Sequence, residues 1–404
     1  MWKTRIAREK AAARALPGTV LALGLVSLLM DTSTELVHSV LPIVMKDQLG
    51  APMAVIGLIE GAAEGLAAFT KVFSGALSDY VRRRKLLAVV GYGLAAITKI
   101  AFPLAGSLAP VVTARFVDRV GKGIRGAPRD ALVADVTPIA RRGAAYGLRQ
   151  SMDSVGAFLG PALAVLCLGM FSQNVTATLW IAVIPAFLAV GVLVLFVREP
   201  ACAAAKGPAR LPLSRAEVRR LPGAFWRVIG LAASFSLARF GEAFLVLRGA
   251  DVGLSLRFVP LALVVMNVVY AAVAYPAGRA SDRLERRVLL LSGLAALIAA
   301  DGALAAANGT ATFLLGAALW GLQMGLTQGL IAKLVAEAAP GDLRGTAFGI
   351  LNLVSGAALL ASSTAAGAIW SIYGPAATFL WGALPALLAC GLVLRGSAAP
   401  PRRT

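Results

Sequence analysis

One stretch of the chain places closely spaced charges in an apolar setting. Residues 115–130 read RFVDRVGKGIRGAPRD and directly follow an apolar run. If this stretch is a helix, steps of three and four put its charges on one stripe, formed by Arg115, Asp118, Lys122, Arg125 and Arg129. A charge at the bilayer centre costs about 2.5–3.5 kcal/mol on insertion scales, so such charges face partners or a polar cavity. We therefore expect the other helices to surround this stripe.

Neighbouring apolar spans carry charges that could pair with the stripe. The anions in these spans are Asp31, Glu35, Glu60, Glu64, Asp118, Asp130 and Asp153. The cations are Lys71, Lys99, Arg115, Arg119, Lys122, Arg125, Arg129 and Arg149. Because the two sets are nearly equal in number, the pattern favours mutual pairing over an open basic pore. His38, the single histidine, shares a helical face with Asp31 and Glu35.

A buried carboxylate whose cationic partner moves can bind and release a proton. Asp31 and Arg119 each lie near the middle of their spans, and we predict that this pair takes up and releases a proton. For most of the other charges, structural ion pairs that lock the bundle are an equal alternative. The candidate set is Asp31, Glu35, Glu64, Asp118, Arg119, Lys122, Arg125, Arg149 and Asp153.

The composition indicates an all-α integral membrane protein. Of 404 residues, 58% are hydrophobic and 15% are charged, whereas a soluble protein carries about 25% charged residues. Windowed hydropathy predicts twelve transmembrane helices. They are placed near residues 18–44, 53–77, 86–106, 109–131, 144–170, 176–197, 226–247, 258–278, 288–306, 312–335, 346–371 and 376–394.

Basic residues gather in alternate loops, including 82–85, 141–142 and 279–287. The positive-inside rule then puts both termini of a multi-pass protein in the cytoplasm. We expect the protein in the plasma membrane, as a bacterial inner-membrane protein. The first apolar run continues without a cleavage pattern, and we interpret it as a retained helix. Most of the basic residues behind the net charge of +19 lie in these alternate loops, so nucleic-acid binding is not expected.

Several functional classes find no support in the sequence. Cys167, Cys202 and Cys390 have no metal-binding spacing, and one histidine cannot build a multi-histidine site. Gly121 and Lys122 lack the rest of a phosphate-binding loop. No nucleophile and base stand in a catalytic pattern. We therefore predict no enzyme activity, no cofactor and no metal.

The two halves of the chain repeat. Residues 75–84, GALSDYVRRR, match residues 278–287, GRASDRLERR, and 141–147 match 343–349 at nearly the same offset. Parallel repeats of six helices build one large class of secondary transporters. We predict a cytoplasmic tail at 1–17, a six-helix bundle at 18–197, a cytoplasmic linker at 198–225, a second bundle at 226–394 and a tail at 395–404.

These features resemble the major facilitator superfamily along the whole chain. The family's loop signature after its second helix is matched by Gly75, Leu77, Asp79, Arg83 and Arg84, although Arg82 replaces a glycine. The second copy keeps Gly278, Asp282, Arg283 and Arg286. The resemblance implies a cytoplasmic gate in which Asp79 faces the start of the eleventh helix near Gly345, where the helix dipole favours an anion. A purely topogenic arginine cluster is the alternative.

Two further motifs resemble that family. Arg119 and Gly123 fit its fourth-helix motif, with Lys122 at the usual glutamine. Gly156, Gly160 and Pro161 fit its fifth-helix antiporter motif, although Ala164 and Val165 replace the last two glycines. Close packing of small residues is the alternative interpretation. The second half has fewer charges, and its candidate cavity residues are Arg239, Glu242, Asn267, Trp320 and Gln323.

The sequence thus predicts a secondary active transporter that works by alternating access, as a monomer in a lipid bilayer. The first choice is proton-coupled export of a small organic or toxic solute, which the partial antiporter motif implies. Uptake or exchange of an anionic solute is the alternative, because the fourth span is basic. A membrane receptor or scaffold without a transport cycle is the alternative of another class.

Overall fold

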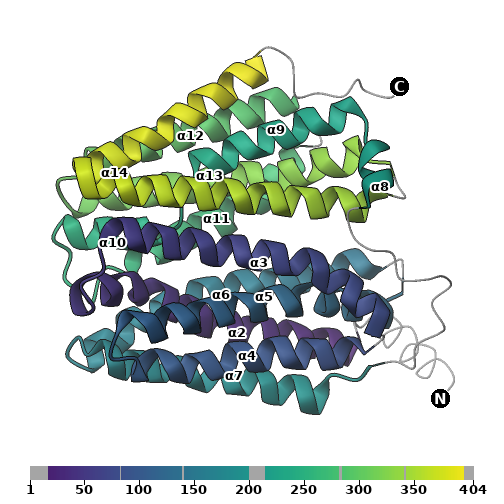
Figure 1. Cartoon of the computed structure of the whole chain (residues 1–404), viewed down its shortest axis with the longest axis horizontal. Helices are drawn as coiled ribbons and strands as arrows, with labels where there is room; N and C mark the ends of the chain where they lie inside the picture. Colours follow the sequence, from purple (N-terminus) through teal and green to yellow (C-terminus); the bar gives the residue numbers. More distant parts are fainter. Residues whose placement is uncertain are drawn as a thin grey trace, which may run out of the picture.

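The computed structural model describes residues 17–81, 83–138, 141–199, 214–281, 284–340 and 343–394. Within these ranges the chain is helical and contains no β-strand (Figure 1). The helices are α2 Gly18–Ile43, the π-helical segment η1 Val44–Gln48, α3 Met53–Val81, α4 Arg84–Leu104, α5 Leu108–Val136, α6 Arg142–Met170, α7 Val175–Phe196, α8 Arg215–Arg219, α9 Gly223–Ala238, α10 Ala243–Asp251, α11 Leu261–Ala280, α12 Arg286–Ala305, α13 Thr310–Ala338 and α14 Arg344–Leu394.

These helices form twelve membrane crossings. Ten segments of the described chain are long and apolar enough to span a bilayer. The ninth and tenth helices, α9 and α10, form one such segment, although the backbone between them, from Arg239 to Glu242, is not helical. The segment α14 contains two crossings, because Gly374 (φ 85°) breaks it with a backbone conformation that favours glycine. The remaining crossing is α5, which carries too many charged residues to be one of the ten apolar segments.

The repeat seen in the sequence reappears in the helix positions. The starts of α4 and α12, Arg84 and Arg286, differ by 202 positions. The same offset separates the starts of α5 and α13, Leu108 and Thr310. It also separates α6 from α14. We call α2–α7 the N-terminal half and α9–α14 the C-terminal half.

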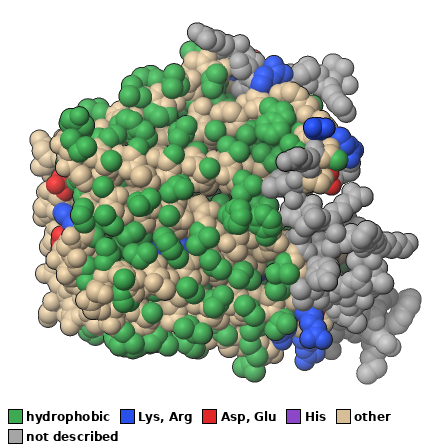
Figure 2. All heavy atoms as spheres, viewed as in Figure 1, with side chains coloured by type: hydrophobic (Ala, Val, Ile, Leu, Met, Phe, Trp, Pro, Cys, Tyr) green, Lys and Arg blue, Asp and Glu red, His purple; other side chains and the backbone are tan. Residues whose placement is uncertain are grey.

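Apolar side chains cover much of the outer surface of the molecule. Figure 2 shows hydrophobic side chains spread over both halves, with charged side chains visible mainly near the two ends. Large residues such as Leu195, Phe196 and Leu388 are exposed on this surface. An apolar surface of this extent is stable in contact with lipid, whereas soluble monomers rarely show one.

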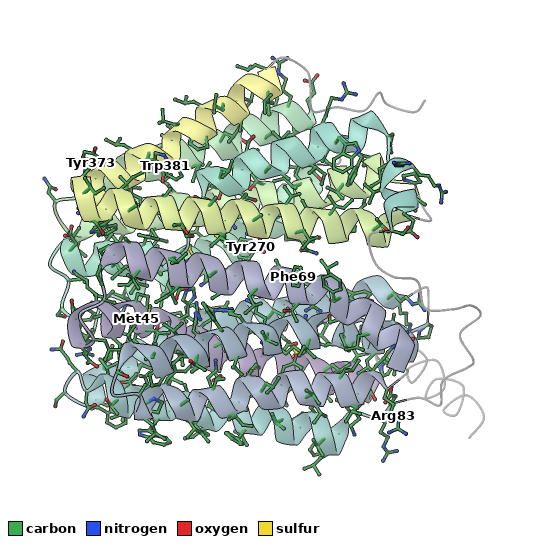
Figure 3. All side chains as sticks on the ribbon, viewed as in Figure 1. Met45, Phe69, Arg83, Tyr270, Tyr373 and Trp381 are labelled. Carbon is green, nitrogen blue, oxygen red and sulfur yellow. The ribbon has the colours of Figure 1, made fainter. Side chains whose placement is uncertain are left out.

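The two halves meet most closely toward one end of the bundle. Figure 3 labels Met45 and Tyr373 at this end and Arg83 at the opposite end, where α8 also lies. Gly57 of α3 packs against the backbone of α14 at Ser363. The backbone N–H of Ala54 donates to Ser371 Oγ at 3.0 Å. Small residues allow this close helix–helix approach.

Several sequence-based predictions fall on residues that the structure does not describe. The two predicted tails, apart from Pro17, and half of the linker, residues 200–213, are among them. So are Asp282, Arg283 and the side chain of Asp79. Within the described part of the linker, the short helix α8 begins after Ser214, whose Oγ accepts a hydrogen bond from the N–H of Glu217 at 3.3 Å.

Candidate functional site

The fourth crossing, α5, lies in the interior of the N-terminal half and carries the charged stripe. Arg115, Asp118 and Arg119 are each 1% exposed. Glycines let the neighbouring helices approach this helix: Gly121 packs against the carbonyl of Gly91 on α4, and Gly123 packs against Thr70 on α3. The close approach brings charged side chains of α3 and α4 within reach of the stripe.

The first group of ion pairs joins α5 to α3 and α2. Arg115 Nη2 donates to Glu60 Oε2 at 2.5 Å, and both side chains are at most 2% exposed. Nε2 of His38, on α2, lies 3.6 Å from the same carboxylate oxygen. Nδ1 of His38 lies 3.4 Å from Glu35 Oε2. His38 therefore stands between two carboxylates from different helices.

The second group lies one turn further along α5. Lys99 Nζ, on α4, donates to Asp118 Oδ1 at 2.8 Å, and both side chains are at most 2% exposed. Arg119 Nη1 lies 3.2 Å from Glu64 Oε1 on α3, and Arg119 Nε lies 4.0 Å from Asp118. Charges of opposite sign are thus paired, as the nearly equal numbers of acidic and basic residues in these spans predicted.

The third group connects α5 to α2 and α6. Arg125 Nη2 lies 3.9 Å from Asp31 Oδ1, and the Arg125 guanidinium stands 4.7 Å from the centre of the Tyr92 ring. Arg129 Nη1 lies 3.8 Å from Asp153 Oδ1. Arg149 donates to Asp153 at 2.6 Å, one turn along the same helix, α6.

The predicted partnership of Asp31 with Arg119 is corrected by this geometry. Asp31 is paired with Arg125, and Arg119 is paired with Glu64. The reason is rotation around the helix: at about 100° per residue, positions six apart point about 120° away from each other. Depth in the membrane, which suggested the original pair, does not determine which neighbouring helix a side chain faces.

A cavity of about 310 Å³ lies among α9, α13 and α14 of the C-terminal half. Its lining includes Arg239, Gln323 and Asn352. A second cavity of about 180 Å³ also contains Arg239 and is lined by Glu64 of the N-terminal half. One anion and one cation, each from a different half, therefore border the same space.

The other candidates of the C-terminal half have different places. Trp320 is fully buried and packs edge-on against Phe240 at 5.4 Å, so the structure places it in the aromatic core rather than in a cavity. Asn267 Nδ2 donates to the carbonyl of Ala157 at 3.2 Å and so links α11 to α6. Glu242 lies at the break between α9 and α10 and faces Glu35 and His38.

The described residues of the gate signature pair within their own halves. Arg84 forms an ion pair with Asp135, and Arg286 forms one with Glu337 at 2.7 Å. Arg84 and Arg286 are 202 positions apart, and so are Asp135 and Glu337. Each half therefore contains the same contact. Arg83 is exposed and points away from the bundle (Figure 3). A Cβ at Gly75 would be in ordinary contact with Ala127, and one at Gly278 would meet open space.

The antiporter-like motif lies where α6 crosses α2. Gly156 packs against Leu28 and Asp31, and Gly160 packs against Thr32, Glu35 and Leu36. Pro161 stands inside α6. The missing side chains let α6 approach the face of α2 that carries Asp31 and Glu35. The antiporter-like motif is therefore a close helix–helix contact at the positions of these two carboxylates.

One buried carboxylate was not singled out from the sequence. Asp301, on α12, is fully buried, and neither of its oxygens has a hydrogen-bond partner among the described residues. Its neighbours include Gly382 and the carbonyl of Ala238. A lone aspartate in the apolar span 288–306 is the signal that points to it, because such residues are rare in membrane helices.

Comparison with known proteins places this architecture in a family. The family model of the Major Facilitator Superfamily matches residues 23–248 and 243–404. An uncharacterised MFS-type transporter of Methanocaldococcus jannaschii is 30% identical over 388 residues, which cover 94% of this chain and 95% of the relative. An uncharacterised protein of Mycobacterium tuberculosis is 24% identical over 357 residues, 87% of each chain.

Solved structures share the fold at low sequence identity. The nucleoside transporter NupG superposes with a TM-score of 0.75 at 14% identity, covering 93% of this chain and 99% of that one. The human organic anion transporter MFSD10 gives a TM-score of 0.63 at 18% identity, with coverages of 93% and 99%. Together with twelve crossings and a half-chain repeat, these matches show that the chain belongs to the Major Facilitator Superfamily and is a membrane transporter.

Proposed function

We propose that this transporter exports a small organic or toxic solute in exchange for protons, by alternating access. We place it in a bacterial inner membrane as a monomer, with both termini in the cytoplasm. The observation that carries the proposal is the network of buried ion pairs around α5, because part of it borders a cavity between the two halves. Intramembrane charges that are both paired and accessible are the arrangement that proton relays use.

Exposure separates the carboxylates of this network into two classes. Glu60 and Asp118 are 2% exposed and lie against close cationic partners, which supports a structural role. The side chains of Asp31 and Glu64 are 26% and 29% exposed, with partners at 3.9 and 3.2 Å. We therefore assign proton exchange to Asp31 with Arg125 and to Glu64 with Arg119.

The contacts between the halves support alternating access. The two halves pack backbone to backbone near Gly57, whereas Glu64, further along α3, borders open space. Rocking of one half against the other about the α3–α14 contact would close this space and open the opposite end. The gate assigned to Asp79 and its basic loop belongs to the same proposal.

The α2–α6 contact supports export over import. Gly156 and Gly160 press α6 against the face of α2 that bears Asp31. A contact of this kind seals the N-terminal half against leakage of solute while protons move along the charged stripe. The partial match to the antiporter motif agrees with this assignment.

A proteoliposome assay tests both coupling and direction. Substrates are first identified by thermal shift of the purified protein against cationic, neutral and anionic solutes. External solute should then accumulate when the vesicle interior is acidic, and symport would require the opposite gradient. Asp31→Asn should abolish accumulation while solute binding remains. The matched control is Asp47→Asn, an exposed residue of η1, which should behave as wild type.

Accumulation at wild-type rates in Asp31→Asn would remove this residue from the coupling mechanism. Glu64→Gln tests the second accessible carboxylate, because glutamine keeps the shape of the side chain and removes its charge. If both variants still accumulate solute at wild-type rates, the proposal that protons are exchanged at Asp31 and Glu64 is wrong.

A second candidate, transport of an anionic solute, has its own supporting observation. Lys122 is exposed although it lies on the intramembrane stripe, and no carboxylate of the described chain lies within 4.0 Å of it. Arg239 borders both cavities and likewise has no ion pair within that distance in the described ranges. Two cations without close counterions attract an anion. Arg239→Gln should then remove the stabilisation by anionic solutes and leave that by neutral solutes unchanged.

A further inference from the structure

Three potential metal ligands meet where the two halves touch. Glu35 and His38 lie one turn apart on α2, and Glu242 lies at the break between α9 and α10. One ligand atom from each of the three lies within 4.8 Å of the other two. The cluster therefore draws two ligands from the N-terminal half and one from the C-terminal half.

Charge balance distinguishes these carboxylates from those of the ion-pair network. Arg115 is matched by Glu60, and Arg119 is matched by Glu64. In contrast, neither Glu35 nor Glu242 has a lysine or arginine nitrogen within 4.0 Å in the described part of the chain. With a neutral imidazole, the cluster carries a charge of about −2, which a divalent cation neutralises.

His38 has a carboxylate on each side of its ring. Its Nε2 lies 3.6 Å from Glu60 Oε2, and this carboxylate is fixed by Arg115 at 2.5 Å. Nδ1 is then the nitrogen on the side of Glu35. A carboxylate behind a ligating histidine sets the tautomer and the ring orientation. Glu60 is 98% buried, and its Oε1 has no hydrogen-bond partner among the described residues.

We propose that Glu35, His38 and Glu242 bind a divalent transition-metal ion, with Zn²⁺ as the representative, between the two halves. Imidazole nitrogen and carboxylate oxygen are both zinc ligands, and an open zinc site has three protein ligands with a water in the fourth position. Mg²⁺ and Ca²⁺ prefer all-oxygen sites and should bind less well. Because Glu242 belongs to the other half, the ion ties α2 to the α9–α10 break and stabilises the conformation in which they meet.

The test is a titration of purified protein with Zn²⁺ by isothermal calorimetry. The chain is prepared without a polyhistidine tag, stripped with a chelator, and carries alanine at its three cysteines so that thiols contribute nothing. We expect one Zn²⁺ per chain and at least tenfold weaker binding in His38→Gln and in Glu242→Gln. Asp47→Asn, which changes an exposed carboxylate outside the cluster, is the matched control and should keep its affinity within about threefold.

A second readout does not depend on the ligand variants. Glu60→Gln keeps all three ligands but weakens the support of His38, and we expect a loss of about 10–100-fold in affinity. Co²⁺ in place of Zn²⁺ should give the visible absorption of a four-coordinate site. No Zn²⁺ binding above that of Mg²⁺, or equal affinities in wild type, His38→Gln and Glu242→Gln, would overturn the proposal. Since the readout is binding alone, this result is independent of the transport proposal.

Discussion

The buried pair of Lys99 and Asp118 allows a quantitative prediction of stability. Both side chains are at most 2% exposed, and Nζ lies 2.8 Å from Oδ1. Removing one member of such a pair strands the other charge in a medium of low dielectric, at a cost of about 3–5 kcal/mol. Replacing both members with apolar residues of similar volume is often neutral or stabilising. The double variant should therefore be more stable than either single variant.

The surroundings of Lys99 and Asp118 predict which single variant loses more free energy of unfolding. In Asp118→Leu, Lys99 loses both its counterion and its hydrogen-bond acceptor and keeps, among the described residues, the ring of Phe102, whose centre is 5.7 Å from Nζ. We expect the full loss of about 3–5 kcal/mol in free energy of unfolding. In Lys99→Met, Asp118 retains Arg119 Nε at 4.0 Å, so the loss should be smaller, about 1–3 kcal/mol. The double variant Lys99→Met/Asp118→Leu should lie within about 1 kcal/mol of wild type.

The assay is a double-mutant cycle on unfolding in detergent micelles, followed by the fluorescence of the six tryptophans. The sum of the single losses minus the double loss gives the coupling energy. A coupling of several kcal/mol with the predicted ranking supports a pair that is buried and mutually compensated. If both single variants cost less than about 1 kcal/mol, or if the double variant loses as much as the sum, the description of this pair is refuted.

Two further predictions concern packing and topology. A Cβ at Gly160 would lie 2.7 Å from atoms of α2, so Gly160→Ala should destabilise by about 1–3 kcal/mol, whereas Gly191→Ala, with nothing within 4 Å, should not. Melting temperatures of the two variants check this, and equal values would contradict it. Arg83→Cys should be shielded from an impermeant thiol reagent in intact cells, and Asn308→Cys should be labelled. Labelling of the 83 position from outside would reverse the proposed orientation.

The helices could be predicted because hydropathy and loop charges are local properties. The predicted spans around α4, α6 and α7 agree with the structure to within a few residues. The break from Arg239 to Glu242 was missed, because averaging over a window hides four non-helical residues in an apolar segment.

The members of the charge network were predicted from the sequence, but their partners were not. Pairing depends on how each helix is rotated against its neighbours, and spacing along one helix does not contain this information. For this reason Arg119 was assigned to Asp31 rather than to Glu64. The approach of Glu242 to His38 requires contact between the halves, which no local pattern reports.

The separation of charge between the halves has a consequence for how this protein can change. The larger cavity is lined by α9, α13 and α14, whereas the ion pairs around α5 all lie in the N-terminal half. Substitutions at Gln323 or Asn352 would alter the shape and polarity of the lining without removing a member of any α5 ion pair. If this cavity is the solute site, the solute preference can change through uncharged residues of the C-terminal half while the ion pairs of the N-terminal half stay the same.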